Sequence, residues 1–379
     1  MARTIIRGKP VGKPAEHKMG AELMQTIKEI DKAYGGGLVL KGRGVQQPMR
    51  IPTGIFAVDL ATCGGIPVRG ISMFHGRRSS GKTTSALKTI AQAQRLWPDL
   101  DHVFVDAEHS FESVWAAKLG VDLDRLILVQ PETGEQGVNI MDALMQTPGV
   151  GLMVLDSIAA LIPMKELDAA AEDAHVGIHA KLVTTLMRRI TAAFSKARQT
   201  GRMMAFLCIN QERAGIGKWA PPGQEAINLP GGKALDHYTM LQIKFKNKEN
   251  ISKDHQGIET LEYNEHAFQI DKNKMNAGLR KGEFQLMRRA NEEKGLVEGD
   301  LDDCGTMIAY AKKVGIYTGG GQSWTLDLNG VPIKFRSADE ACQHFQSDHD
   351  DFWALRNHLI ALHAQKMGMP ADFIQRFYE

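Results

Sequence analysis

The sequence predicts an α/β fold centred on a mostly parallel sheet, with a short unit before the sheet and a small α+β domain after it. Three observations lead to this prediction. A glycine-rich loop separates a short apolar stretch from a stretch with helical periodicity, further apolar stretches end in polar residues, and helix-like stretches lie between them. Strands that alternate with helices in this way are typical of doubly wound sheets.

The 379 residues are long enough for one large domain with smaller parts beside it. We expect residues 1–50 to form a basic tail and a helix–strand unit, residues 51–299 the α/β core, and residues 300–379 a C-terminal domain. In the first part, residues 19–34 predict a helix with one apolar face, and residues 38–40 predict a short strand. That face must be buried either in its own domain or against a neighbouring subunit, and the pattern leaves both open.

Residues 76–83 fit G-x-x-x-x-G-K-[ST], a pattern typical of a phosphate-binding loop. Its glycines let backbone N–H groups cradle phosphate oxygens, and the helix expected over residues 83–95 adds the positive end of its dipole. Lys82 can reach the β- and γ-phosphates, and Thr83 offers a hydroxyl to Mg²⁺. The strand–loop–helix order favours nucleotide binding over a plain glycine-rich turn. The residues expected to hold the nucleotide are Gly76, Arg77, Arg78, Ser79, Ser80, Gly81, Lys82, Thr83 and Thr84.

Further apolar stretches predict buried strands over residues 102–106, 126–129, 152–156 and 204–211. Acidic residues at the carboxyl end of a strand beside a phosphate loop face the nucleotide in open α/β sheets. Glu108 follows one of these strands, and Asp156 ends another. Asp156 is therefore the expected acidic partner of the loop, where it would hold a Mg²⁺-bound water.

Two segments between the strands do not resemble simple connections. Residues 164–176 are polar with few large apolar side chains, and residues 212–233 are rich in glycine, proline and basic residues. Loops this long in a compact domain are usually functional or disordered. Lys181, Arg188 and Arg189 follow the first segment and could meet phosphates, although a solvated charged face is the simpler interpretation of these residues alone.

After the second segment, residues 239–245 and 259–270 predict a hairpin of two strands. Lys272 and Lys274 are separated by one residue, so in a strand they would point the same way.

The pattern changes after residue 300. Residues 308–314 and 352–367 predict helices, and a hairpin is expected across Asn329 and Gly330, a favoured turn pair. These elements predict the small α+β domain at the end of the chain.

Composition limits the classes of function. The formal net charge is +2, so nucleic-acid binding would depend on a local patch and not on overall charge. The four cysteines form no C-x-x-C pair, which is typical of a reduced cytoplasmic protein. The histidines show no metal-ligand spacing, so we expect no zinc site. No stretch predicts a membrane span or a secretory signal, so no membrane partner is expected.

Four extended motifs, residues 104–109, 118–122, 130–136 and 155–161, closely resemble the bacterial RecA recombinases. The resemblance runs from about residue 19 to the C-terminal helix. It implies a RecA-type P-loop ATPase core in a protein that forms a helical filament on single-stranded DNA, with ATP and Mg²⁺ between protomers. Such a protein pairs and exchanges strands with homologous duplex DNA. The N-terminal helix–strand unit would then pack on the next protomer.

The resemblance also implies roles for individual residues. Glu108 would activate the attacking water, and Gln211 would sense the γ-phosphate. Lys272 and Lys274 match the pair that reaches the neighbouring protomer's ATP, and Thr83 and Asp156 would serve Mg²⁺. The adenine contacts would be Glu112 and Trp115. The DNA contacts implied for the two polar segments and the helix between them are Val176, Lys181, Thr184, Arg188, Arg213, Ile216, Gly231, Gly232 and Lys233.

Two of the departures from the family pattern bear on the expected nucleotide and DNA sites. Arg77 and Arg78 stand where bacterial members usually have Pro-Glu, and Ala267 and Gln269 replace basic residues that serve the second DNA. Such divergence fits a phage-encoded or otherwise distant relative. Two other functions remain open: a non-catalytic paralogue that binds DNA as an accessory, and a hexameric helicase on the same fold.

Overall fold

The computed structural model describes residues 20–34, 39, 47–167, 177–214, 227–253, 259–275, 278–292 and 294–376. The chain forms two units, residues 1–46 and residues 47–379. In the described part of the first unit, α1 spans Ala21–Tyr34, which confirms the expected helix, and no residue of this helix is buried. The strand expected over residues 38–40 lies outside the described residues, apart from Val39.

A large sheet forms the centre of the second unit. In its described part, eight strands follow the order β12-β11-β10-β3-β7-β6-β4-β5. Neighbours from β10 to β5 run parallel, whereas β11 runs antiparallel to both of its neighbours, β10 and β12. The mostly parallel sheet is confirmed, and an antiparallel hairpin extends it. The strands are β3 (Ile71–Gly76), β4 (Asp101–Asp106), β5 (Leu126–Val129), β6 (Val150–Asp156), β7 (Ala205–Gln211), β10 (Leu241–Lys253), β11 (Glu259–Asn273) and β12 (Lys281–Met287).

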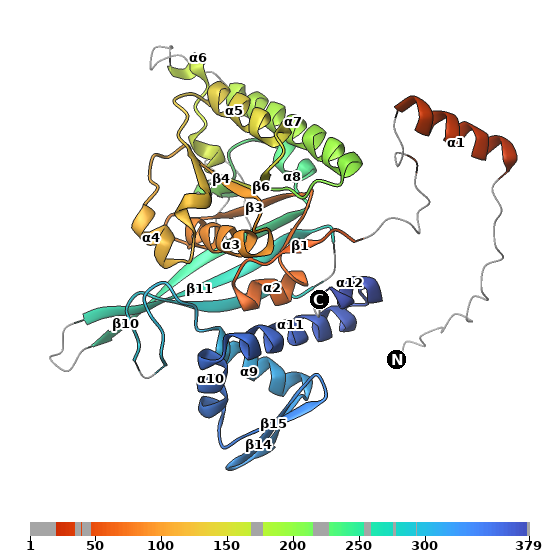
Figure 1. Ribbon diagram of the computed structural model, residues 1–379. Coiled ribbons are helices and arrows are strands. Elements are labelled where there is room, and N and C mark those ends of the chain that lie inside the picture. The colour runs from red at the N-terminus through yellow and green to blue at the C-terminus, as the bar shows by residue number, and fades with distance from the viewer. Residues whose placement is uncertain are drawn as a thin grey trace, which may run out of the picture. The chain divides into compact units, whose positions relative to one another are not determined.

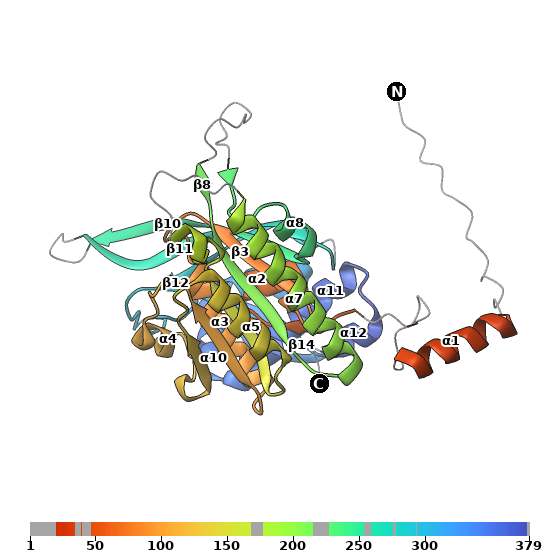
Figure 2. The same ribbon diagram turned by 90° about the horizontal axis from the view of Figure 1, so that it is seen from above.

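Helices cover both faces of this sheet (Figure 1). On one face, α3 (Lys82–Leu96) contributes Ile90 to a core that includes Phe74 and Phe104. On the other face, α5 (Gly134–Gln146) and α7 (Ile178–Thr200) contribute Met141 and Leu186 to a second core. Both views show the far ends of β10 and β11 projecting beyond the rest of the sheet (Figure 2).

Short elements connect these layers. The helices and 3₁₀ turns are α2 (Phe56–Thr62), α4 (Ser113–Lys118), η2 (Leu123–Arg125), η3 (Ile158–Ala160), α6 (Met164–Leu167) and α8 (Ala234–Tyr238). Two-residue strands pair as β1 (Arg50–Ile51) with β2 (Ile66–Pro67), and β8 (Arg213–Ala214) with β9 (Ile227–Asn228). Across the ranges that the structure describes, no helix has both the length and the apolar character needed to span a membrane.

The end of the chain is an α+β arrangement. Its elements are α9 (Asp303–Val314), β13 (Tyr317–Gly320), β14 (Ser323–Leu328), β15 (Val331–Phe335), α10 (Ala338–Ser347), α11 (His349–Lys366) and α12 (Ala371–Gln375). The expected hairpin is confirmed, since Asn329 and Gly330 have φ angles of 55° and 85°. Helix α11 begins earlier than expected because the Asp348 side chain accepts the amides of Asp350 and Asp351, both at 3.0 Å.

Helix α2 joins the core of this C-terminal part. Phe56 and Leu60 of α2 pack in one cluster with residues from α9, β14 and α11. The Phe56 amide donates to Asp303 Oδ2 over 3.0 Å, and the guanidinium of Arg356 in α11 forms an ion pair with Asp59. The C-terminal elements are therefore held to the core by apolar packing and by a buried ion pair.

His102 on β4 predicts a loss of stability in acid. Its Nδ1 accepts the Leu152 amide over 3.0 Å, it is fully buried, and burial lowers its pKa to about 4 from 6.5. The unfolded chain binds the proton more tightly, so the contribution of His102 is complete above pH 6.5 and is lost as pH falls towards 4, by about 3 kcal/mol. Unfolding free energies of the wild type and His102→Asn, measured over this range, should diverge at high pH and converge in acid. A constant difference would contradict this prediction.

Candidate functional site

The nucleotide loop, residues 76–83, lies between the end of β3 and the start of α3. Two of its glycines cannot be replaced without strain. Gly76 has a φ of +153°, and a Cβ there would lie 2.3 Å from the Phe245 carbonyl oxygen. Gly81 has a φ of +88°, and a Cβ there would lie 2.8 Å from the His266 ring. Neighbouring strands therefore hold the loop in the tight turn that exposes its backbone N–H groups.

Lys82 is already positioned inside this loop. Its Nζ donates to the Arg77 carbonyl over 2.6 Å and lies 3.4 Å from Ser80 Oγ. Burial lowers the pKa of Lys82, whereas the carboxylates of Asp156 and Glu108 oppose this shift. The side chains of Arg77 and Arg78 are exposed. The ammonium group thus occupies a concavity where a phosphate oxygen could replace the loop's own acceptors.

Side chains at or just after the ends of β4, β6 and β7 meet beside the nucleotide loop, together with Thr83 of α3. Thr83 Oγ1 donates to Asp156 Oδ2 over 2.6 Å, and burial raises the pKa of Asp156 to about 6. Glu108 Oε1 accepts two hydrogen bonds of 2.6 Å, from Ser157 Oγ and from Gln211 Nε2. The structure therefore brings together Thr83, Asp156, Glu108 and Gln211, as the sequence predicts.

The residues at the nucleotide loop fit a nucleoside triphosphate with Mg²⁺. Helix α3 starts at Lys82 with Gly81 as its N-cap and no side-chain hydrogen bond to its first amides, which leaves those amides to a ligand. A hydroxyl and a carboxylate placed 2.6 Å apart are oxygen ligands of the type that Mg²⁺ prefers. Among the described residues, no group of three or more His, Cys, Asp or Glu side chains is arranged to hold a metal ion.

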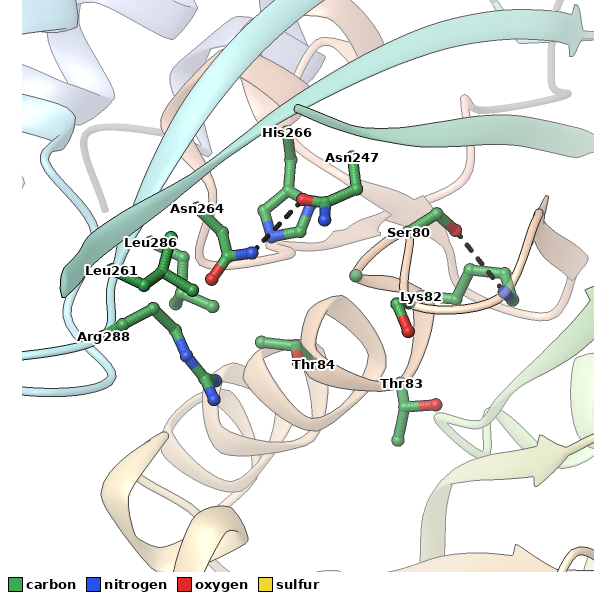
Figure 3. A pocket seen from close by; sticks show the side chains of 12 residues that line it. Ser80, Lys82, Thr83, Thr84, Asn247, Leu261, Asn264, His266, Leu286 and Arg288 are labelled. Atoms are coloured by element: carbon green, nitrogen blue, oxygen red, sulfur yellow. Dashed lines mark hydrogen bonds between the residues drawn. The ribbon is translucent and has the colours of Figure 1, made fainter. Parts of the chain in front are cut away.

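A cavity of about 380 Å³ opens beside the nucleotide loop (Figure 3). Side chains from the antiparallel part of the sheet form its other wall, and sequence analysis did not identify them. They are Asn247, Leu261, Asn264, His266, Leu286 and Arg288. Asn264 and His266 are two residues apart on β11, and this alternation is the one local signal that they share a face.

The residues expected at adenine, Glu112 and Trp115, do not line this cavity. Trp115 of α4 is partly buried, and the Arg288 guanidinium lies 4.8 Å from its ring centroid. Arg288 itself lines the cavity. Glu112 is exposed at the N-cap of α4. Trp115 therefore contacts Arg288, which lines the cavity. The roles of Trp115 and Glu112 at adenine stay predictions.

Lys272 and Lys274 contact helix α8. Lys272 pairs with Gln242 near the start of β10, whereas the loop follows the end of β3. The Lys272 ammonium donates to the Asp236 carbonyl of α8, and Lys274 Nζ donates to the His237 carbonyl over 3.1 Å. Both lysines cover the carbonyl end of α8 within one chain.

Five of the expected DNA contacts, Lys181, Thr184, Arg188, Gly231 and Gly232, lie on or beside the first half of α7. Lys181, Thr184 and Arg188 are spaced along one face of this helix, and Lys181 and Arg188 are exposed. A Cβ on Gly231 would lie 3.2 Å from Val183 Cγ1, and one on Gly232 would lie 3.2 Å from Ala180 Cβ. These glycines let the backbone of the second segment approach α7 closely.

Arg213 and Lys233 are exposed at the two ends of the second segment. The pair β8–β9 joins Arg213 to Asn228 at its base. Val176 and Ile216 lie outside the described residues.

Comparisons with known proteins agree with this arrangement. Residues 21–291 match the model of the RecA N-terminal domain. The chain is 35% identical to Protein RecA of Leifsonia xyli subsp. xyli over 298 residues, which cover 78% of this chain and 79% of the relative. It is 33% identical to Protein RecA of Enterococcus mundtii over 362 residues, or 95% of this chain and 96% of the relative. Together with the fold and the nucleotide loop, these matches show that the chain belongs to the RecA family.

Proposed function

We propose that this protein is a DNA-dependent ATPase that forms a filament on single-stranded DNA and catalyses homologous pairing and strand exchange. One observation supports it above all. Gln211 binds Glu108 over 2.6 Å, and the next residue begins the second polar segment, 212–233. The group expected to activate water and the segment expected to bind DNA are therefore linked through a single side chain.

In this proposal each residue has a distinct task. The amides of the nucleotide loop and the Lys82 ammonium bind the phosphates, and Thr83 with Asp156 holds Mg²⁺. The metal neutralises phosphate charge when it is bound. The Glu108 carboxylate orients the attacking water and accepts its proton. Gln211 reports DNA binding by moving relative to Glu108.

In the filament, each protomer would supply positive charges to the nucleotide site of its neighbour. The ammonium groups of Lys272 and Lys274 contact carbonyls of α8 and not this chain's Lys82, and we infer that they serve the nucleotide of a neighbouring protomer. Cations from another subunit stabilise transition-state charge as an arginine finger does. Hydrolysis would then require the filament, with single-stranded DNA, homologous duplex DNA and further copies of the chain as partners.

ATP hydrolysis measured with and without single-stranded DNA tests this function. We expect strong stimulation by DNA that weakens as salt rises, because phosphate contacts release counterions. Stimulation should also rise steeply with protein concentration if neighbouring protomers complete the site. DNA binding without hydrolysis would instead support the accessory function, and unwinding of a forked duplex by a ring would support the helicase.

A further inference from the structure

Four ionisable side chains meet at the carboxyl end of the parallel strands, beside the nucleotide loop. We call His75, Glu212, Lys244 and Asp271 the His75 cluster. His75 Nδ1 lies 3.0 Å from Glu212 Oε1, and His75 Nε2 lies 3.2 Å from Asp271 Oδ2 without the alignment of a hydrogen bond. Lys244 Nζ contacts the same Glu212 oxygen at 2.7 Å. The His75 and Glu212 side chains are only 4% and 5% exposed.

The topology creates this cluster. Lys244 on β10 is the register partner of His75 on β3, so the two residues lie side by side. The β10–β11 pairing shifts between Gln242 and Ile243, and this irregularity falls at Asp271. A bulge redirects the side chain of the extra residue. Residues more than 190 positions apart along the chain are thereby placed around one imidazole.

The His75 cluster connects three segments of the proposed machinery. His75 immediately precedes Gly76 of the nucleotide loop, and Asp271 immediately precedes Lys272. Glu212 immediately follows Gln211, and its amide donates to the Gly76 carbonyl over 3.1 Å. A movement of either carboxylate would therefore be transmitted to a residue proposed to act in hydrolysis.

The proton on His75 decides whether the cluster holds together. An imidazolium donates from both ring nitrogens, whereas a neutral imidazole donates from one and presents a lone pair at the other. Glu212 would keep Lys244 as its cation in either state. The hydrogen-bond geometry at Nδ1 favours the tautomer that keeps the proton there, so the Asp271 carboxylate would face the lone pair at Nε2. Gln269 Nε2 already donates to Asp271 Oδ1 over 2.7 Å and would remain as the partner of that carboxylate.

The two carboxylates of the cluster favour a protonated His75, whereas the nearby ammonium groups of Lys244, Lys233 and Lys82 oppose it. Burial would lower the pKa of His75, but Asp271 and Glu212 outweigh it and raise this pKa above its ordinary value of 6.5. His75 and Lys244 in turn lower the pKa of Glu212 against the effect of burial. Lys233 and Asp236, at the start of α8, line the same cavity of about 400 Å³, and Lys82 lies within electrostatic range of Glu212.

We propose that His75 is a proton-controlled positioning residue that couples the DNA segment to the nucleotide site. Protonated His75 binds Glu212 and Asp271 together and so fixes Gln211 beside Glu108. Loss of the proton releases Asp271 and weakens that coupling. The coupling is complete below pH 6.5 and is lost as pH rises through the raised pKa of folded His75. This inference rests on the proposed function, because its readout is stimulation by DNA.

The test measures ATP hydrolysis between pH 6 and 9, with and without single-stranded DNA, together with binding of a fluorescent ATP analogue. We expect the stimulation by DNA to fall several-fold with rising pH in the wild type while nucleotide binding is retained. Asp271→Asn should abolish this fall, because an amide can partner either form of the imidazole. His75→Gln should give low stimulation at every pH. The control is His349→Gln, an exposed histidine of α11, which should keep the wild-type profile.

The outcomes separate the two proposals. No stimulation by DNA at any pH would overturn the proposed function. Stimulation that is independent of pH in the wild type, or a fall that persists unchanged in Asp271→Asn, would overturn the role of His75. NMR titration of the His75 imidazole in the wild-type protein checks the same point without a variant, and an ordinary or lowered pKa would count against the inference.

Discussion

Replacing Glu108 with Gln is expected to reduce DNA-stimulated ATP hydrolysis by roughly 10²–10⁴-fold while ATP binding is retained. Gln keeps the carbonyl oxygen that can accept the 2.6 Å hydrogen bonds from Ser157 and Gln211, so the site should keep its shape. The change removes only the carboxylate that orients water and accepts its proton. Single-turnover hydrolysis with saturating single-stranded DNA, beside an ATP-binding measurement, separates these effects.

Glu112→Gln is the matched control, because Glu112 is also an exposed carboxylate but follows the strand end at a greater distance along the chain. We expect it to change the apparent affinity for ATP more than the rate of hydrolysis. If Glu108→Gln hydrolyses ATP at the wild-type rate, the catalytic carboxylate lies elsewhere and the assignment of Glu108 is wrong. If Glu108→Gln loses ATP binding as well, its role is structural.

Replacing Arg356 with Ala is expected to destabilise the protein by about 3–5 kcal/mol. Arg356 is 2% exposed and Asp59 is fully buried, so the variant leaves a carboxylate without its cation in the interior. The Thr53 amide and hydroxyl donate to Asp59 at 2.7 Å and cannot replace the lost charge. Because the ion pair joins α2 to α11, unfolding should begin in the C-terminal elements. Thermal unfolding measures the loss of stability, and hydrogen exchange shows which elements open first.

A double variant distinguishes a lost ion pair from lost packing. Asp59→Asn combined with Arg356→Met removes both charges at similar volume and should recover much of the stability that Arg356→Ala loses. Equal destabilisation of the single and double variants would show that packing of Arg356, including its stacking 4.8 Å from the Trp353 ring, dominates instead.

Local patterns in the sequence were enough to predict much of the fold. The nucleotide loop, the apolar strands that end at Asp156, at Gln211 and shortly before Glu108, and the hairpin turn at Asn329 all depend on chemistry within a few residues. A glycine needed for a tight turn or a polar residue at a strand end has the same meaning in many proteins. Parallel strands then bring their carboxyl ends to one edge, which explains why these residues meet.

Other features were decided by the tertiary structure alone. The cavity wall formed by Asn247, Asn264 and Arg288 depends on how the antiparallel hairpin lies beside the loop, which no local motif records. The position of Lys272 opposite Gln242 depends on the register of that hairpin. The ion pair of Asp59 with Arg356 and the His75 cluster join residues that are distant along the chain. The sequence by itself determined the nucleotide loop and the strand ends, because backbone geometry and hydrophobic period act locally. Partners across the sheet were decided only by the fold, because burial and charge pairing depend on which strands become neighbours.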